Sequence, residues 1–195
     1  QRASVANSQG SLSSLVETVF KLLVIIGLFP ILTLTFVGSD VFSVIFGSSW
    51  AEAGVYAQIL SIWAFVWFIS HPLSSIYVVM EKQQFGLKFN IFNFITRLLS
   101  LAIGGLIGNA RVALVLFALS GTFVYGYLCF KMLAYSGVKI SHVRHIILSK
   151  LLLFSPVGAI LFILKYVGTN EYLIVGISGS FIALYYLYVI RTDEE

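Results

Sequence analysis

Long apolar runs separated by short polar segments dominate the pattern of this chain. About 20 consecutive apolar residues suffice for a helix to cross the hydrocarbon core of a membrane. The strands of a membrane β-barrel would instead alternate over about ten residues, whereas these runs are uniformly apolar. We therefore predict an all-α, polytopic transmembrane helix bundle of about six spans. The expected spans are residues 12–37, 55–80, 89–107, 112–133, 151–167 and 172–190.

The polar segments divide the chain into five parts. Residues 1–11 are small and polar and are predicted to form a linker, after which residues 12–135 hold four spans. Residues 136–150 are predicted to be a basic cytoplasmic loop, residues 151–190 two further spans, and residues 191–195 a cytoplasmic tail. Because the connections are short, we expect successive spans to be antiparallel neighbours.

Prolines in the first two spans predict local irregularities in their helices. Pro30 lies inside the first span and should kink it, because proline removes a backbone donor and clashes with the preceding turn. His71-Pro72 interrupts the second span, where we expect a local kink, with a ligand contact or a proton relay at His71 as the alternative. Residues 40–54 are too short to cross, and we expect them at the membrane interface with Trp50 as an anchor.

Composition and charge agree with this picture. Hydrophobic residues make up 59% of the 195 residues and charged residues 10%, whereas a soluble domain carries about 25% charged residues. Basic residues are scattered through loops, so the net charge of +4 does not indicate a nucleic-acid partner but fits loops beside anionic lipid headgroups. One set of connections and ends holds Arg2, Lys82, Lys88, Lys131, Lys139, Arg144, Lys150 and Arg191, and the opposite set holds only Arg111 and Lys165.

This eight-to-two bias orients the chain. Because cytoplasmic loops carry the excess of Lys and Arg, both ends of the chain are expected to be cytoplasmic. The chain begins with Gln1 and has no signal-peptide layout, so we expect it to be the C-terminal part of a longer protein.

No catalytic constellation is visible in the sequence. It has no pair of intramembrane carboxylates, no HExxH and no glycine-rich phosphate loop. The single cysteine, Cys129, cannot form an internal disulfide, and His142 and His145 lack a third metal ligand nearby. We therefore expect a protein that is not an enzyme and uses no cofactor or metal.

Five polar residues are candidates for a substrate cavity. Arg97 lies inside the third span, where a charge costs at least about 2.5–3.5 kcal/mol. It either faces a wet interior or snorkels back to the headgroups, and both interpretations stay open. Asn93 lies one turn away on the same face. Glu17 and Lys21 are spaced i,i+4 in the favourable order, and form either an interfacial pair or part of a polar path; His71 completes the set.

The order of motifs from Lys21 to Gly126 resembles one family. The motifs are KLLVIIGLFPILTLTFVG, then DVFSVIFGSSW ending in a phenylalanine-glycine turn, YAQILSIWAF, MEKQQFGLKFNIFN and NFITRLLSLAIGGLIGNARVALVLFALSGTFVYGY. In this order they resemble the C-terminal portion of polysaccharide flippases. These O-antigen and capsule repeat-unit transporters belong to the multidrug/oligosaccharidyl-lipid/polysaccharide exporter superfamily. A small departure is Arg111-Val112-Ala113, where the family usually has alanine or glycine-alanine.

The resemblance implies a two-lobed bundle in the bacterial cytoplasmic (inner) membrane, of which this chain is part of the second lobe. The partners would be a polyprenyl diphosphate-linked oligosaccharide, membrane lipid and the N-terminal lobe, which this sequence lacks. Arg97 and Lys21 would point into the cavity between the lobes and hold phosphate or a sugar carboxylate. Alternatives are a multidrug or peptidoglycan-precursor exporter of the same superfamily, or a membrane-embedded glycan polymerase or ligase.

Overall fold

The computed structural model describes the backbone of residues 2–193 and the side chains of residues 12–192. All regular elements of this part of the chain are helical, and six segments are long and apolar enough to cross a membrane. The protein is therefore an all-α, multi-span membrane protein, as the apolar runs predict. The elements are α1 (Arg2–Phe46), η1 (Ser48–Trp50), α2 (Ala51–Ser70), η2 (Pro72–Ser74), α3 (Ser75–Val79), α4 (Gln83–Ile107), α5 (Ala110–Tyr135), α6 (Ile140–Tyr166) and α7 (Glu171–Asp193).

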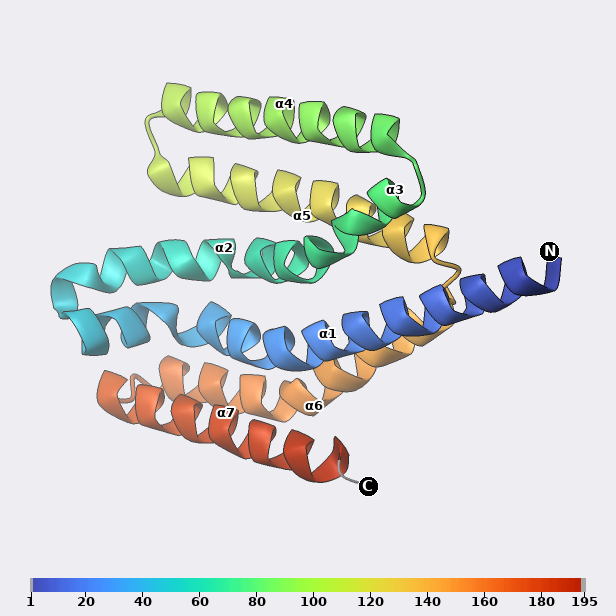
Figure 1. Ribbon diagram of the computed structural model, residues 1–195. Helices are drawn as coiled ribbons and strands as arrows, with labels where there is room; N and C mark the ends of the chain where they lie inside the picture. The colour runs from blue at the N-terminus through green and yellow to red at the C-terminus, as the bar shows by residue number, and fades with distance from the viewer. Residues whose placement is uncertain (1, 194–195) are drawn as a thin grey trace.

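The long helix α1 lies across the middle of the bundle (Figure 1). It packs against α2 on one side and against α6 and α7 on the other, and α5 then packs against α2 and α4 against α5. Successive long helices run in opposite directions, so the two termini lie at the same end (Figure 1). We call this the basic end, because the lysine-bearing connections 80–82 and 136–139 also lie there.

The order of neighbours differs from the expectation that successive spans pack together. α1 packs on α2 and α4 on α5, but α5 lies between α2 and α4, and α6 packs on α1 rather than on α5. The physical reason is the connection from α2 to α4. It contains η2 and the short helix α3, which contacts both α4 and α5, so this connection is long enough to carry the chain past α5.

Several boundaries differ from the sequence predictions. Residues 2–11 belong to α1 rather than to a linker, and residues 40–46 extend α1 instead of lying apart from it. α1 ends only at Gly47, whose φ of 99° suits a residue without a Cβ. The predicted basic loop 136–150 shrinks to residues 136–139, because Ile140, Val143 and Ile147 recur at helical spacing and Val143 packs into the core.

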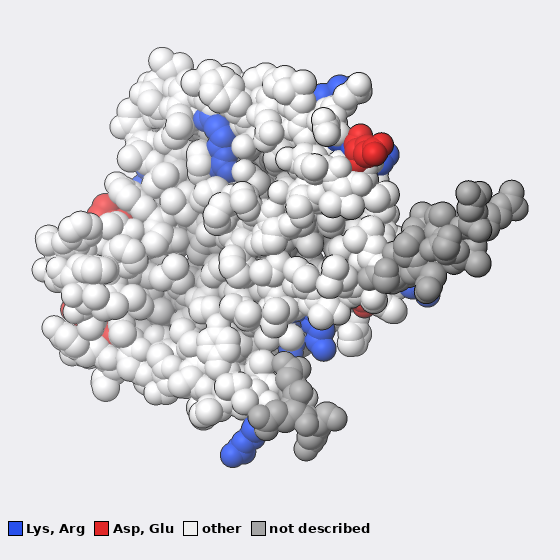
Figure 2. All heavy atoms as spheres, viewed as in Figure 1, with Lys and Arg blue, Asp and Glu red and all other residues white. Residues whose placement is uncertain are grey.

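The largest apolar core joins α1 to α2, α3, α5 and the start of α6. Val24 of α1 and Met132 of α5 are completely buried in it, and Leu128 and Leu73 are nearly so. The remaining surface is mostly apolar: the face in Figure 2 is largely uncharged, and its charged side chains gather near the two ends and over α4 and α5. This is the surface that a hydrocarbon environment requires.

Pro30 sits within α1, and the bundle compensates for it. A proline has no N–H, so the carbonyl of Ile26 loses its intrahelical donor. The hydroxyl of Tyr186 in α7 donates to this carbonyl at 2.7 Å, and the neighbouring Tyr185 donates to the carbonyl of Ile25 at 2.8 Å. The proline therefore creates the acceptor that fixes α7 against α1.

We predict that Tyr186→Phe lowers stability by about 1 kcal/mol, because it leaves the Ile26 carbonyl unpaired in an apolar setting. In a Pro30→Ala background the same substitution should cost less, since the introduced alanine supplies the missing N–H. Melting temperatures in detergent micelles measure both effects. Tyr188→Phe is the control, because the Tyr188 side chain is exposed and its hydroxyl has no hydrogen bond among the described residues. Equal losses in the two backgrounds would contradict this account.

A second prediction concerns the crossings themselves. In a Cys129→Ala background, cysteines at Ser48 and Ser141 should react with a membrane-impermeant maleimide from opposite sides. Both positions are exposed, Ser48 in the turn after α1 and Ser141 in the first turn of α6. Labelling of intact and permeabilised cells distinguishes the sides. Labelling of both positions from one side would show that the helices do not cross as described.

Candidate functional site

Arg97 lies near the middle of α4, about 21 Å from the start of the helix at 1.5 Å per residue. Its guanidinium carbon is 3.6 Å from the centre of the Phe117 ring, 4.5 Å from that of Trp63 and 5.9 Å from that of Tyr125. The side chain thus turns inward against α2 and α5 and does not snorkel toward the headgroups. We call Arg97, Asn93, Trp63, Phe117 and Tyr125 the Arg97 site.

Hydrogen bonding within the Arg97 site is sparse. Arg97 Nε donates to Asn93 Oδ1 at 3.4 Å, and Asn93 Nδ2 donates to the Tyr125 hydroxyl at 3.5 Å. The one-turn spacing of Asn93 and Arg97 on α4 allows the contact between them. Arg97 forms no salt bridge within the described part of the chain. Its Nη1 and the Nε1 of Trp63 are buried there without an acceptor. Two N–H donors from different helices are therefore left over.

The aromatic contacts offset only part of the cost of placing Arg97 in the membrane. A cation–π contact contributes about 0.5–1 kcal/mol when exposed and about 2 when desolvated. The charge itself costs at least about 2.5–3.5 kcal/mol at the centre of a span. The arrangement therefore holds a cation in place without neutralising it, and an anion that accepts from the spare donors would complete it.

Gly121 of α5 makes this arrangement possible. A Cβ at this position would lie 2.6 Å from Trp63 Nε1 and 2.8 Å from Arg97 Nη2. Real Cβ atoms do not approach other atoms so closely, so any side chain at position 121 would displace the indole or the guanidinium. A glycine within a helix lowers stability by about 0.5–1 kcal/mol relative to alanine. At position 121 this loss allows Trp63 and Arg97 to pack directly against the backbone of α5.

A row of aromatic rings on α2 connects the Arg97 site with His71. The rings of Trp63 and Trp67 are 6.4 Å apart, and those of Trp67 and His71 are 5.2 Å apart. The spacing of four residues puts the three on one helix face. His71 is exposed at the end of α2, where the predicted interruption before Pro72 is confirmed.

Sequence reasoning missed four residues of this region: Trp63, Phe117, Gly121 and Tyr125. The pattern W-x₃-W-x₃-H on α2 could have identified Trp63 as part of a row. Nothing comparable marks the α5 residues, because they meet Arg97 only through the packing of α4 on α5.

The predicted pair of Glu17 with Lys21 is wrong. Glu17 Oε1 pairs with His142 Nδ1 of α6 at 3.1 Å, because α6 begins early enough to bring His142 to α1. Lys21 is exposed and has no ion pair among the residues the structure describes. Both Glu17 and Lys21 lie on α1, whereas the Arg97 site is built by α2, α4 and α5. In the described residues, no three His, Cys, Asp or Glu side chains gather as a metal site would require.

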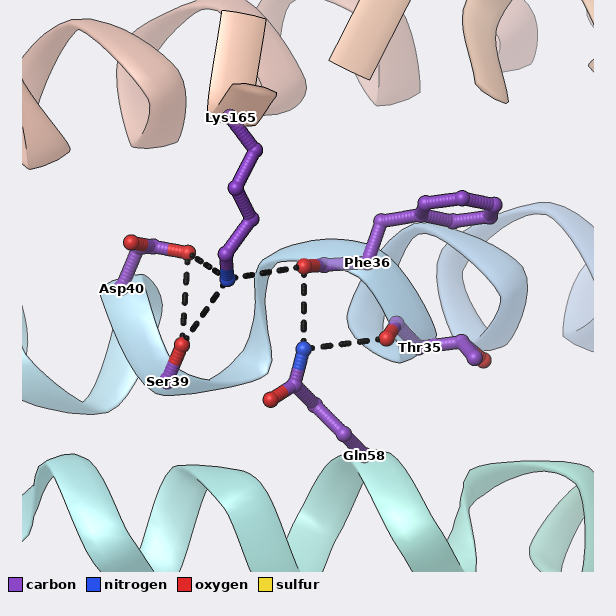
Figure 3. A network of polar contacts seen from close by, with 6 residues as sticks. All are labelled: Thr35, Phe36, Ser39, Asp40, Gln58 and Lys165. Atoms are coloured by element: carbon purple, nitrogen blue, oxygen red, sulfur yellow. Dashed lines mark hydrogen bonds and ion pairs between the residues drawn. The ribbon is translucent and has the colours of Figure 1, made fainter. Parts of the chain in front are cut away.

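A second polar network ties α6 to α1 near the end opposite the basic end (Figure 3). Lys165 Nζ donates to Asp40 Oδ2 at 2.7 Å, to Ser39 Oγ at 3.0 Å and to the carbonyl of Phe36 at 3.2 Å. All three donor sites of the ammonium are used. Lys165 therefore serves to hold the helices together and is not free for a ligand.

Helix α2 is tied to α1 and to α5 at the same end. Gln58 Nε2 donates to the carbonyls of Thr35 and Phe36 at 3.0 and 2.9 Å (Figure 3). Arg111 makes a bidentate pair with Glu52, at 2.9 Å from Nε and 2.6 Å from Nη2. Arg111 and Lys165 are thus neutralised by carboxylates of the protein itself, whereas Arg97 has no carboxylate partner among the described residues.

Comparison with protein-family models, with curated proteins and with solved structures found no match for this chain. The multi-span membrane fold is therefore shown by the helices alone.

We predict that Gly121→Ala destabilises the protein by about 1–3 kcal/mol, the usual range for overpacking. The new methyl group would push Trp63 or Arg97 out of the site. Gly126→Ala on the same helix is the matched control, because its Cβ would meet only Val66, at 4.0 Å. That variant should be neutral or slightly stabilising. Melting temperatures and tryptophan emission in detergent measure the effect, and similar behaviour of both variants would contradict the assigned role of Gly121.

Proposed function

We propose that this chain is part of a flippase that moves lipid-linked oligosaccharides across the bacterial cytoplasmic membrane, for the synthesis of O-antigen, capsule or exopolysaccharide. The observation that carries the proposal is the Arg97 site: an arginine held in the middle of a membrane span by aromatic rings, with a buried donor left unused. The multi-span fold and the motif order from Lys21 to Gly126 support it.

The cargo of such a flippase carries a diphosphate and often acidic sugars. Arg97 suits these groups, because its planar fork donates two parallel hydrogen bonds to phosphate or carboxylate oxygens. The Nε1 of Trp63 offers a further donor beside it, and Asn93 can exchange its long contacts for a sugar hydroxyl. Charge and hydrogen bonding would thus act together on the polar head of the cargo.

The proposal also gives the bundle an orientation. The basic end would face the cytoplasm, as the positive-inside rule predicts. Lys21, exposed and without an ion pair among the described residues, and His71, exposed at the end of the aromatic row, remain proposed cargo contacts. The family resemblance implies a first lobe, which would close the cavity opposite this chain.

The alternatives receive less support from the site. A multidrug exporter that binds cations needs an acid, but the Arg97 site contains no carboxylate and Glu17 is paired with His142. A glycan polymerase or ligase would be expected to carry a large outer loop. The connections at the end opposite the basic end are short in the described chain: 47–50, 108–109 and 167–170. An anionic cargo is therefore the better match.

We predict that Arg97→Ala in the full-length protein reduces surface glycan about tenfold or more, because a charge-assisted contact to the cargo is lost. Arg97→Lys should reduce it less, since lysine keeps the charge but not the fork. Surface glycan is measured by immunoblot or flow cytometry at matched protein levels.

The control for this experiment is Arg144→Ala. It removes the same charge from an exposed position on α6, outside the Arg97 site, and should leave surface glycan unchanged. Normal surface glycan in the Arg97→Ala strain, or equal losses in the Arg97 and Arg144 strains, would refute the proposed role.

A further inference from the structure

A groove runs along the outside of the α4–α5 pair. It has a volume of about 600 Å³ and an almost wholly apolar lining that includes Phe89, Phe92, Phe123 and Tyr127. Phe92 is 58% exposed and Phe123 is 76% exposed, so the described part of the protein does not cover them. Phe89 touches the Arg97 site, because its ring packs edge-on against that of Tyr125 at 5.5 Å. None of the five residues of that site lines the groove, which opens beside it.

A polar hollow opens where the groove reaches the basic end of the bundle. It has a volume of about 580 Å³, and Lys82, Gln83, Gln84 and Glu81 lie on its rim. The groove and the hollow share Phe85 and Lys88, so they form one continuous surface with an apolar part and a polar mouth.

Basic side chains prevail at this mouth. Lys88 lies where the two parts join, and Lys82 Nζ is 4.5 Å from the centre of the Tyr135 ring. Lys131 Nζ is 5.6 Å from the centre of the Tyr127 ring, which lines the groove. Glu81 is the acid on the rim, and it makes no ion pair with these lysines in the described structure. The mouth therefore presents uncompensated positive charge beside an apolar slot.

We propose that this surface binds one anionic phospholipid, with its phosphate between Lys82 and Lys88 and an acyl chain in the groove. Basic residues near the ends of spans attract anionic headgroups, and an acyl chain gains by covering the exposed rings. This inference does not rest on the flippase proposal, because neither Arg97 nor the cargo takes part.

The dimensions favour a lipid over a protein segment. A helix is about 10–12 Å across with its side chains, and along the stretch from Phe85 to Thr96 it would occupy roughly 1,300–1,900 Å³, more than the groove holds. A single acyl chain is slender enough to fit. A soluble phosphate compound would use the lysines but would gain nothing from the aromatic slot.

The test uses the purified full-length protein and native mass spectrometry. Phosphatidylglycerol and phosphatidylcholine with the same acyl chains are added in turn, and the retained lipid is counted. The expected result is one tightly held phosphatidylglycerol, retained about tenfold or more better than phosphatidylcholine. The double variant Lys82→Gln/Lys88→Gln should lose this preference, and Lys82→Arg/Lys88→Arg should keep it.

The matched control is Lys139→Gln/Arg144→Gln, which removes two charges near the basic end of the bundle but outside the groove. It should retain phosphatidylglycerol as the unmodified protein does. Equal retention of the two lipids, an equal loss in the control, displacement by soluble glycerol phosphate, or a lipid-free dimer in place of the lipid adduct would each overturn the proposal.

Discussion

In a hydrocarbon environment every backbone carbonyl needs a donor from the protein itself, and the central helix α1 meets this requirement with donors from several neighbouring helices. Pro30 removes one intrahelical donor, and the carbonyls of Thr35 and Phe36 accept side-chain donors as well. The donors come from α7, α2 and α6 in turn: Tyr186, Gln58 and Lys165. The helices that surround α1 are thus held by hydrogen bonds to its backbone as well as by apolar packing. In lipid, apolar packing alone specifies helix partners weakly, because lipid tails are as apolar as the side chains.

The sequence predicted the number of spans well, because the length of an apolar run is a direct measure of a membrane crossing. It predicted the neighbours less well. The lengths of the connections do not show that α3 carries the chain past α5. The basic residues between 140 and 150 suggested a loop, although the apolar residues around Val143 recur at helical spacing. Partners far apart in the chain were also out of reach: His142 lies 125 residues from Glu17, and local spacing favoured Lys21 instead.

Arg97 shows what sequence can and cannot say about a site. The sequence alone showed that its depth in the span carries a free-energy cost and that Asn93 shares its helix face. The choice between a wet interior and snorkelling needed the positions of Trp63 and Phe117, which hold the guanidinium from α2 and α5. Gly121 supports the site because it has no Cβ to displace Trp63 or Arg97. This contribution depends on how the helices pack, and the sequence alone does not show it. Together these residues hold a positive charge inside the span, and the proposed anionic cargo rests on that arrangement.

The contact between Tyr186 and Ile26 also sets an order of events during synthesis. The two residues are 160 positions apart, and the tyrosine lies in α7, the sixth of the described spans. While the ribosome is still producing α2 to α6, the carbonyl exposed by Pro30 has to remain with water, translocon or lipid headgroups. Insertion of α7 thus supplies the hydrogen-bond donor for the Ile26 carbonyl of α1. A nascent chain halted before α7 would expose this unpaired carbonyl to the proteases that remove misfolded membrane proteins.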